Sequence, residues 1–270
     1  MIVLRLLALL VAGLALGYGV LVALFWFHQR SLLFHPELAR HPPTPPDASF
    51  DVPGAVLRGW VVNPGRDRAL LYFGGNGEDV SRMRDDAGRL FPHHTVYLVA
   101  YRGYGHSSGT PSESALVADA LRLFDRVAAT HSAVDAMGRS LGSGVAVQLA
   151  AARPVARVAL ITPYDSIDRV AAHHYPWLPI RWLARDRFDS LAQAPRVRAD
   201  VLVVIAGRDD VIPPAHAERL AAALPSPPQM LRLRDAQHSN VQVFPEYEAM
   251  LARFFAGAVA ARSGAGSVDE

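Results

Sequence analysis

The sequence contains no cysteine, and this absence excludes several kinds of chemistry. A chain without cysteine has no disulfide bonds, no thiolate nucleophile and no cysteine-ligated metal. Lysine is absent too, so arginine supplies all 27 basic residues, against 25 acidic ones. The arginines are scattered rather than gathered in runs, which argues against a nucleic-acid partner. Abundant alanine and proline, with arginine in place of lysine, are typical of a GC-rich bacterial coding sequence.

Histidine is present, with 11 residues, but its placement is not that of a metal site. His93 and His94 are adjacent, as are His173 and His174, rather than three or four residues apart, and no carboxylate cluster joins them. We therefore predict neither a metal nor an organic cofactor.

The N-terminal region holds one long uncharged segment. Residues 6–27, LLALLVAGLALGYGVLVALFWF, span about 33 Å as a helix, enough to cross the hydrocarbon core of a membrane. The run is longer than the core of a cleaved signal peptide, about 7 to 15 residues. It ends in FWFHQR, an aromatic-then-basic border typical of a membrane interface. We predict an uncleaved single-pass anchor over residues 1–30, with a signal peptide and a buried helix as the alternatives.

The charges that flank this segment leave its orientation open. Arg5 and the terminal amine lie on one side, and Arg30 and Arg40 lie on the other. We favour the amine inside a bacterial inner membrane and the following domain on the periplasmic side.

Beyond the anchor, the chain changes character twice. Residues 31–48 include the stretch HPPTPPD and predict a stiff, extended, proline-rich spacer. From 49 to 262, apolar strands alternate with amphipathic helices. The predicted strands cover 55–62, 69–73, 95–100, 133–137, 157–162, 201–206 and 230–234, and the predicted helices include 113–129, 142–152, 214–224 and 243–261.

This alternation predicts the fold class. Most of the strands are nearly continuous apolar runs, as in parallel strands covered on both faces. We expect an α/β fold in three layers, with a mostly parallel sheet flanked by helices. A segment at about 166–196, containing HHYPWLPIRWL, interrupts the alternation and predicts a short lid insertion. The tail 263–270, SGAGSVDE, is predicted to be disordered.

One short motif carries the functional prediction. Gly138, Ser140 and Gly142 form Gly-x-Ser-x-Gly between the predicted strand 133–137 and the following helix. The string alone is common, but this position forces a sharp strand-to-helix turn in which larger neighbours would collide. Such a turn presents the serine hydroxyl at the carboxyl edge of the sheet, beside a helix N-terminus. The sequence therefore predicts that Ser140 is a nucleophile.

A serine nucleophile needs a base and an acid that orients the base. The sixth predicted strand is followed by GRDDVIPP, with Asp209 and Asp210, and the last is followed by DAQHSN, with His238. Each residue alone has an ordinary explanation, as a helix cap or a loop histidine. Their joint order predicts a catalytic triad of Ser140, Asp209 and His238. We choose Asp209 over Asp210 because it stands four residues before a proline, as in the common Asp-x-x-x-Pro loop.

The reaction also needs an oxyanion hole made of two backbone amides. One is expected from Leu141, the residue after the nucleophile. The other is expected from the loop GGNGED after the strand 69–73, where we choose Asn76. A tight glycine-rich turn that binds nothing is the alternative for this loop.

Together these motifs resemble the α/β-hydrolase superfamily, and within it the bud-emergence-protein-like branch, which includes membrane-associated serine hydrolases and protein depalmitoylases. The resemblance covers nearly the whole chain and implies an α/β-hydrolase fold with serine hydrolase activity. It rests on QRSLLFHP (29–36), FGGNGED (73–79), YRGYGHSSGTPSE (101–113), MGRSLGSG (137–144), TPYDS (162–166), GRDDVIP (207–213) and QHSN (237–240).

The chain departs from this family at two points. Gly74 and Gly75 stand where much of the superfamily has His-Gly, which puts the stiffness of the oxyanion loop in question. The N-terminal region has no cysteine, so it has no palmitoylation site and the membrane helix would serve as the anchor.

We predict a membrane-anchored serine hydrolase that cleaves a carboxylic ester or thioester through an acyl-enzyme on Ser140. The apolar lid residues Trp177 and Trp182 suggest a lipid-like acyl substrate, although they can equally pack the lid onto the domain. A serine peptidase or acyltransferase on the same triad, and a membrane-tethered scaffold without catalysis, are the alternatives. The sequence leaves the acyl length and the leaving group open.

Overall fold

The computed structural model describes residues 1–39 and 42–257, so the predicted tail and the predicted domain end at 262 lie outside the described residues. Within this part, eight strands form one sheet in the order β1-β2-β4-β3-β5-β6-β7-β8. The first two pairings, β1 with β2 and β2 with β4, are antiparallel, and all others are parallel. The strands are β1 (Ala48–Val52), β2 (Ala55–Val62), β3 (Arg68–Phe73), β4 (His94–Val99), β5 (Ala133–Arg139), β6 (Arg157–Ile161), β7 (Asp200–Ala206) and β8 (Gln229–Leu233).

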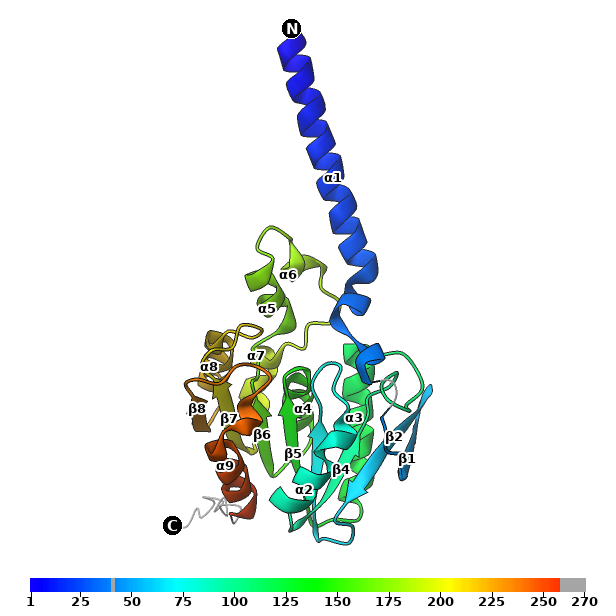
Figure 1. Cartoon of the computed structure of the whole chain (residues 1–270), viewed down its shortest axis with the longest axis vertical. Helices are drawn as coiled ribbons and strands as arrows, with labels where there is room; N and C mark the ends of the chain where they lie inside the picture. The colour runs from blue at the N-terminus through cyan, green and yellow to red at the C-terminus, as the bar shows by residue number, and fades with distance from the viewer. Residues whose placement is uncertain (40–41, 258–270) are drawn as a thin grey trace, which may run out of the picture.

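Helices cover both faces of the sheet, which gives the predicted three layers. Figure 1 shows α2 and α9 in front of the sheet and α3 and α4 behind it. The helices are α1 (Ile2–Leu33), α2 (Arg84–Leu90), α3 (Glu113–Ala128), α4 (Leu141–Ala152), α5 (Ile167–His174), α6 (Ile180–Leu183), α7 (Ser190–Gln193), α8 (Pro214–Ala222) and α9 (Pro245–Ala256). Short 3-10 turns are η1 (Pro36–Ala39), η2 (Val80–Met83), η3 (Ala194–Arg196) and η4 (Val241–Val243).

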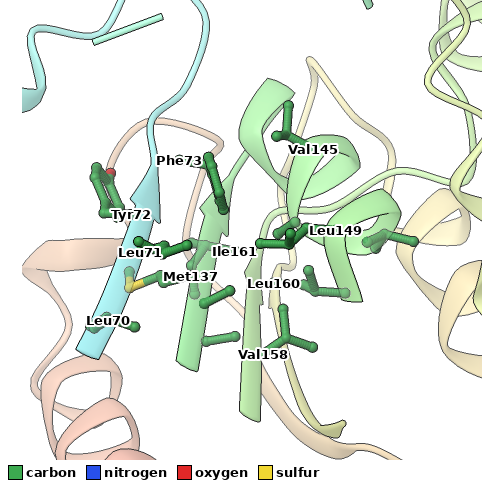
Figure 2. Close-up of a cluster of buried hydrophobic side chains, with 14 of the residues drawn as sticks. Leu70, Leu71, Tyr72, Phe73, Met137, Val145, Leu149, Val158, Leu160 and Ile161 are labelled. Atoms are coloured by element: carbon green, nitrogen blue, oxygen red, sulfur yellow. The ribbon is translucent and has the colours of Figure 1, made fainter. Parts of the chain in front are cut away.

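The central strands are apolar on both faces because each face packs against helices. Leu71 of β3 and Leu160 of β6 are fully buried, as are Val145 and Leu149 on the facing side of α4 (Figure 2). Burial of a leucine or valine side chain stabilises the fold by about 1.5 to 3 kcal/mol. This rigid centre fixes the carboxyl edge of the sheet, where the polar loops of the candidate site begin.

The segment 31–48 differs from the extended spacer that we expected. Helix α1 continues to Leu33, and Phe34 directly after it is only 2% exposed. Farther along, the indole N–H of Trp60 donates to the carbonyl oxygen of Pro45, at 2.8 Å. Strand β1 begins at Ala48 and was not predicted, because its sequence ASFDV directly follows the prolines. The described parts of this segment, around Phe34 and Pro45, therefore pack onto the domain, since Phe34 is a large apolar side chain that gains from burial.

The predicted lid lies between β6 and β7. It consists of α5, α6, α7 and η3, and α5 and α6 project beyond the carboxyl edge of the sheet (Figure 1). Helix α1 rises from the same edge and extends far beyond the rest of the molecule. Of the described helices, this one is long and apolar enough to cross a membrane.

Candidate active site

The turn from β5 to α4 holds Ser140 in a conformation that few residues adopt. Its φ of 49° and ψ of −117° lie outside the ordinary helical and strand regions, and its N–H donates to the carbonyl oxygen of Ile161, at 2.9 Å. A Cβ on Gly138 would overlap the carbonyl of Gly142, and a Cβ on Gly142 would overlap the carbonyl of Phe73. Both glycines of the motif are therefore required by close backbone packing, as the sequence predicted.

Two loops bring an imidazole and a carboxylate to this serine. His238, after β8, lies with Nε2 2.9 Å from the Oγ of Ser140. On the other side of the ring, Nδ1 of His238 lies 2.8 Å from Oδ2 of Asp209. This arrangement fixes the tautomer: Nδ1 carries the proton that it donates to the carboxylate, and Nε2 is free to accept the serine proton.

The position of Asp209 is fixed by its own loop. Its second oxygen, Oδ1, accepts the amides of Val211 and Ile212, at 3.0 and 2.7 Å. The residue is 7% exposed, whereas the neighbouring Asp210 is exposed. The structure therefore brings Asp209 to His238 and leaves Asp210 at the surface.

The two predicted oxyanion donors border the same serine. Leu141 is the first residue of α4, so its N–H has no acceptor within the helix. Asn76 follows Gly75, which lies close enough to Ser140 that a Cβ there would be 3.7 Å from the serine Cβ. The N–H of Gly75 already donates to Oε2 of Glu78, at 2.7 Å, which leaves the Asn76 amide as the candidate in this loop.

The glycine pair in this loop is held by neighbours that the sequence analysis did not single out. Glu78 accepts the N–H of Gly75 and the hydroxyl of Tyr72, and the hydroxyl of Tyr101 donates to the carbonyl of Gly74. Burial raises the pKa of the Tyr101 hydroxyl, so it remains a neutral donor. Glu78 lies within the quoted motif FGGNGED, three residues after Gly75, and this turn spacing was the available signal.

The side chain of Asn76 has a different task from its amide. Its Nδ2 donates to the carbonyl of Leu33 at the end of α1, at 2.6 Å, and its Oδ1 accepts from the N–H of His35 and the hydroxyl of Tyr104. The loop YRGYG therefore shapes the site through Tyr104. His106, which directly follows this loop, is exposed. The candidate oxyanion loop is thus attached to the base of α1.

Two cavities flank this edge of the sheet. One, of about 620 Å³, lies between α1 and the lid and is mainly apolar. The other, of about 460 Å³, is polar and includes Arg139 and Ser239, the neighbours of Ser140 and His238 in the chain. The polar cavity therefore adjoins the candidate triad, whereas the apolar cavity lies between α1 and the lid.

The described residues contain no group of three or more potential metal ligands. The adjacent histidines of α5 instead contact other parts of the protein: the ring of His173 packs edge-on against His216, and Nε2 of His174 lies 2.9 Å from the carbonyl oxygen of Val211.

Comparison with known proteins gives relatives along most of the chain. No family model matches the sequence. An uncharacterised protein of Mycobacterium tuberculosis is 35% identical, over 86% of this chain and 88% of that protein. The alpha/beta hydrolase domain-containing protein 17B of Xenopus laevis is 29% identical, over 72% of this chain and 68% of that protein. The alpha/beta hydrolase domain-containing protein aho-3 of Caenorhabditis elegans is also 29% identical, over 71% and 58%.

Solved structures confirm the predicted fold. The enol-lactonase from Burkholderia xenovorans superposes with a TM-score of 0.63 at 18% identity, over 78% of this chain and all of that one. An esterase from Pyrococcus furiosus gives 0.60 at 16% identity, over 80% and 98%. At such identities the likeness shows the α/β-hydrolase fold and leaves the substrate to be argued from the site.

Proposed function

We propose that the chain is a member of the α/β-hydrolase superfamily, whose fold it has, and that it is a membrane-anchored serine hydrolase that cleaves a carboxylic ester or thioester. Two relatives named as alpha/beta hydrolase domain-containing proteins support this proposal. One observation carries the proposal: a continuous line of hydrogen bonds runs from the Oγ of Ser140 through both ring nitrogens of His238 to a buried carboxylate of Asp209. Further assignment to the bud-emergence-protein-like branch rests on the motifs YRGYG and MGRSLGSG.

The proposed reaction proceeds in two halves. The Oγ of Ser140 attacks the carbonyl carbon while Nε2 of His238 takes its proton, and Asp209 stabilises the resulting imidazolium. The amides of Asn76 and Leu141 donate to the oxyanion of the tetrahedral intermediate. Its collapse expels the alcohol or thiol, which receives the proton from His238. A water molecule, deprotonated by the same histidine, then attacks the acyl-enzyme and releases the carboxylic acid.

The role of α1 as a retained anchor is supported by its contacts with the domain. Arg30 forms an ion pair with Asp186, at 2.7 Å, although Asp186 is almost fully buried. The guanidinium of Arg185 lies over the ring of Trp26, 4.2 Å from its centroid. Removal of α1 as a signal peptide would break these contacts and leave the Asp186 carboxylate without Arg30. We therefore propose a single-pass membrane protein, anchored in a bacterial inner membrane.

The test is fluorophosphonate labelling of the full-length protein in membranes. Such probes react with an activated serine, so we expect wild-type protein to be labelled and Ser140→Ala to lose labelling completely. Turnover of acyl p-nitrophenyl esters should fall at least 10⁴-fold in the same variant, by the usual size of a triad loss. Ser143→Ala is the matched control, because Ser143 lies in the same motif but donates to the carbonyl of Ser140.

Each outcome selects among the functions that share this site. Ester turnover without peptide turnover supports the hydrolase over a peptidase, and product transfer to an added alcohol would instead favour an acyltransferase. A folded wild-type protein that stays unlabelled would contradict the proposal and favour a membrane-tethered scaffold.

A further inference from the structure

The lid lies beside the part of α1 that is expected to be in the membrane. The hydroxyl of Tyr18 donates to the carbonyl of Trp177 in residues 175–182, the lid tip, at 2.9 Å. Tyr18 stands nine residues before the end of the apolar run 6–27, which corresponds to about 14 Å along a helix. If this run crosses the hydrocarbon core, the lid tip reaches well into the same leaflet.

The surface of the lid tip suits this location. Tyr175, Trp177 and Trp182 are 52%, 54% and 87% exposed, and tyrosine and tryptophan are the residues enriched at membrane interfaces. Arg185, which is exposed and lies over the ring of Trp26 near the end of the apolar run, places positive charge where anionic head groups lie. Arg181, within the same segment as the aromatic residues, has a long side chain that can extend to the head groups. The rings of Tyr175 and Trp177 pack edge-on against each other, and the surface that these rings and Trp182 leave exposed suits contact with lipid.

The cavity of about 620 Å³ lies between these two elements, at the same level. Its upper walls are apolar, with Leu21, Leu24 and Phe25 on α1 facing Trp177 and Leu178 on the lid. The volume falls within the range of about 300 to 1,000 Å³ that is usual for small-molecule sites. An apolar space between a membrane helix and a lid tip that enters the leaflet beside it is accessible to a lipid tail.

The floor of the cavity is polar and contains an unpaired carboxylate. Asp168, in the first turn of α5, is 6% exposed, and its Oδ1 has no hydrogen-bond partner among the described residues. Two other polar lining residues are paired: Gln29 with the backbone of Leu183 and Arg185, and Asp186 with Arg30. A buried carboxylate oxygen without a donor is costly, so the occupant of this cavity is expected to bring one.

The floor also borders the candidate active site. Leu33 lines the cavity, and its carbonyl accepts from the side chain of Asn76 in the oxyanion loop. Ile167, another lining residue, is the first residue of α5, and a short segment joins it to the end of β6. The last residue of β6, Ile161, accepts the N–H of Ser140 through its carbonyl. A polar head group on the floor would therefore lie toward Ser140, with its tail pointing to the bilayer.

We propose that the lid tip 175–182 inserts into the leaflet that α1 crosses, and that the cavity binds a single-chain membrane lipid from that leaflet. Its tail lies between Leu24 and Leu178, and a hydroxyl or ammonium group of its head donates to Asp168. The assignment of this lipid as the substrate rests on the proposed membrane anchor and hydrolase function. Binding of the lipid in the cavity does not require catalysis.

The experiment uses full-length Ser140→Ala protein in phospholipid nanodiscs, with a glycerol monoester whose acyl chain carries a photoreactive diazirine. We expect cross-links within residues 21–33 and 167–184. Ala171→Trp, which fills the cavity, should reduce them at least tenfold, whereas Ala8→Trp, on the exposed N-terminal part of α1, should not. Cross-links that are unaffected by Ala171→Trp, or that lie only within residues 2–17, would overturn the proposal.

Two measurements keep this result interpretable. A short fluorophosphonate should still label Ala171→Trp that retains Ser140, which shows that the variant is folded. Trp182→Gln should weaken the insertion of the lid tip into lipid. The measurement is the quenching of lid tryptophan fluorescence by brominated lipids, which should decrease in the variant. Unchanged quenching in the variant, or no quenching in the parent protein, would contradict insertion of the lid tip.

The head-group assignment is tested by competition against the same cross-link. In the parent protein, a glycerol monoester should compete for the cross-link better than the methyl ester of equal chain length. Asp168→Leu should reduce this difference in competition at least tenfold. Asp168→Asn keeps an oxygen acceptor, so it should spare a hydroxylated head group and weaken an amine-bearing one. Equal competition in all proteins would exclude Asp168 as the contact. Cavity cross-linking together with absent fluorophosphonate labelling would refute the hydrolase function and leave the lipid site intact.

Discussion

Asp–His pairs at the two edges of the same sheet show what distinguishes a candidate active site from a structural contact. At the carboxyl edge, Asp209 pairs with His238, whose second ring nitrogen meets the hydroxyl of Ser140. At the amino edge, Asp135 pairs with His94, at 2.9 Å, and the histidine side chain is 2% exposed. The residue types are the same, but only the first pair has a serine within hydrogen-bond distance.

The buried pair of Asp135 and His94 has an arginine, Arg68, as its third partner, whereas the pair of Asp209 and His238 has the hydroxyl of Ser140. Arg68 donates to both oxygens of Asp135, at 2.9 and 2.8 Å, so the carboxylate is neutralised by a permanent positive charge. His238, by contrast, keeps 15% of its side chain exposed, and Asp209 is held by backbone amides rather than by arginine. An Asp–His pair is therefore a catalytic candidate where no arginine already neutralises the carboxylate. The carboxylate can then stabilise the imidazolium that forms when the histidine takes a proton.

The largest effect is expected from the carboxylate of the candidate site. Asp209→Asn should lower kcat for ester hydrolysis about 10⁴-fold, because the amide favours the wrong tautomer of His238. Thermal unfolding and kcat measurements on the purified protein check this. Asp210→Asn is the matched control, since Asp210 is exposed, and its kcat should remain within about twofold of wild type. A larger loss in Asp210→Asn than in Asp209→Asn would reverse the assignment.

A loss of stability without a loss of catalysis is expected at the amino edge. Asp135→Asn removes the charge that pairs with Arg68 and His94 and should lower the free energy of unfolding by about 3 kcal/mol. Urea denaturation measures this change. Ester turnover per folded molecule should stay unchanged, because Asp135 lies at the opposite end of β5 from Ser140. A drop in turnover comparable to that of Asp209→Asn would show that the two edges are coupled.

The smallest effect is expected at a third pair, which joins the base of the lid to α8. Nδ1 of His216 lies 2.6 Å from Oδ1 of Asp165, and Arg219 donates to Oδ2 at 2.8 Å. Burial by itself raises the pKa of the Asp165 carboxyl, but the hydrogen bonds with His216 and Arg219 outweigh it and hold the pKa at about 2. The folded value is thus below the ordinary 3.8.

This depressed pKa sets the pH dependence. A carboxyl with a lower pKa in the folded state stabilises the protein above its unfolded pKa and loses that contribution as the pH falls through its folded pKa. Asp165→Asn should therefore cost about 2 kcal/mol at pH 7, and the difference from wild type should shrink between about pH 4 and pH 2. Unfolding measured across this range checks the sign, and a difference independent of pH would refute it.

Sequence reasoning was most successful where local chemistry has few solutions. The strand-to-helix turn at Ser140 needs glycine on both sides, and the acid and base follow later strands of the parallel sheet, so the motif order predicted which loops meet. It was less successful for β1 and for residues 31–48. There the packing of Phe34 and the bond from Trp60 to Pro45 depend on distant partners that prolines in the sequence do not reveal.

The amino-acid sequence by itself determined the α/β-hydrolase fold, the long apolar N-terminal helix and Ser140 and His238 of the candidate triad, because periodicity and turn chemistry are local properties. Only the tertiary structure decided which aspartate meets His238, since Asp209 and Asp210 differ by their loop contacts and not by their chemistry. It alone also placed the lid against α1, where Trp177 meets Tyr18 across 159 residues. Contacts at such separation depend on how the whole chain packs, which no short stretch of sequence encodes.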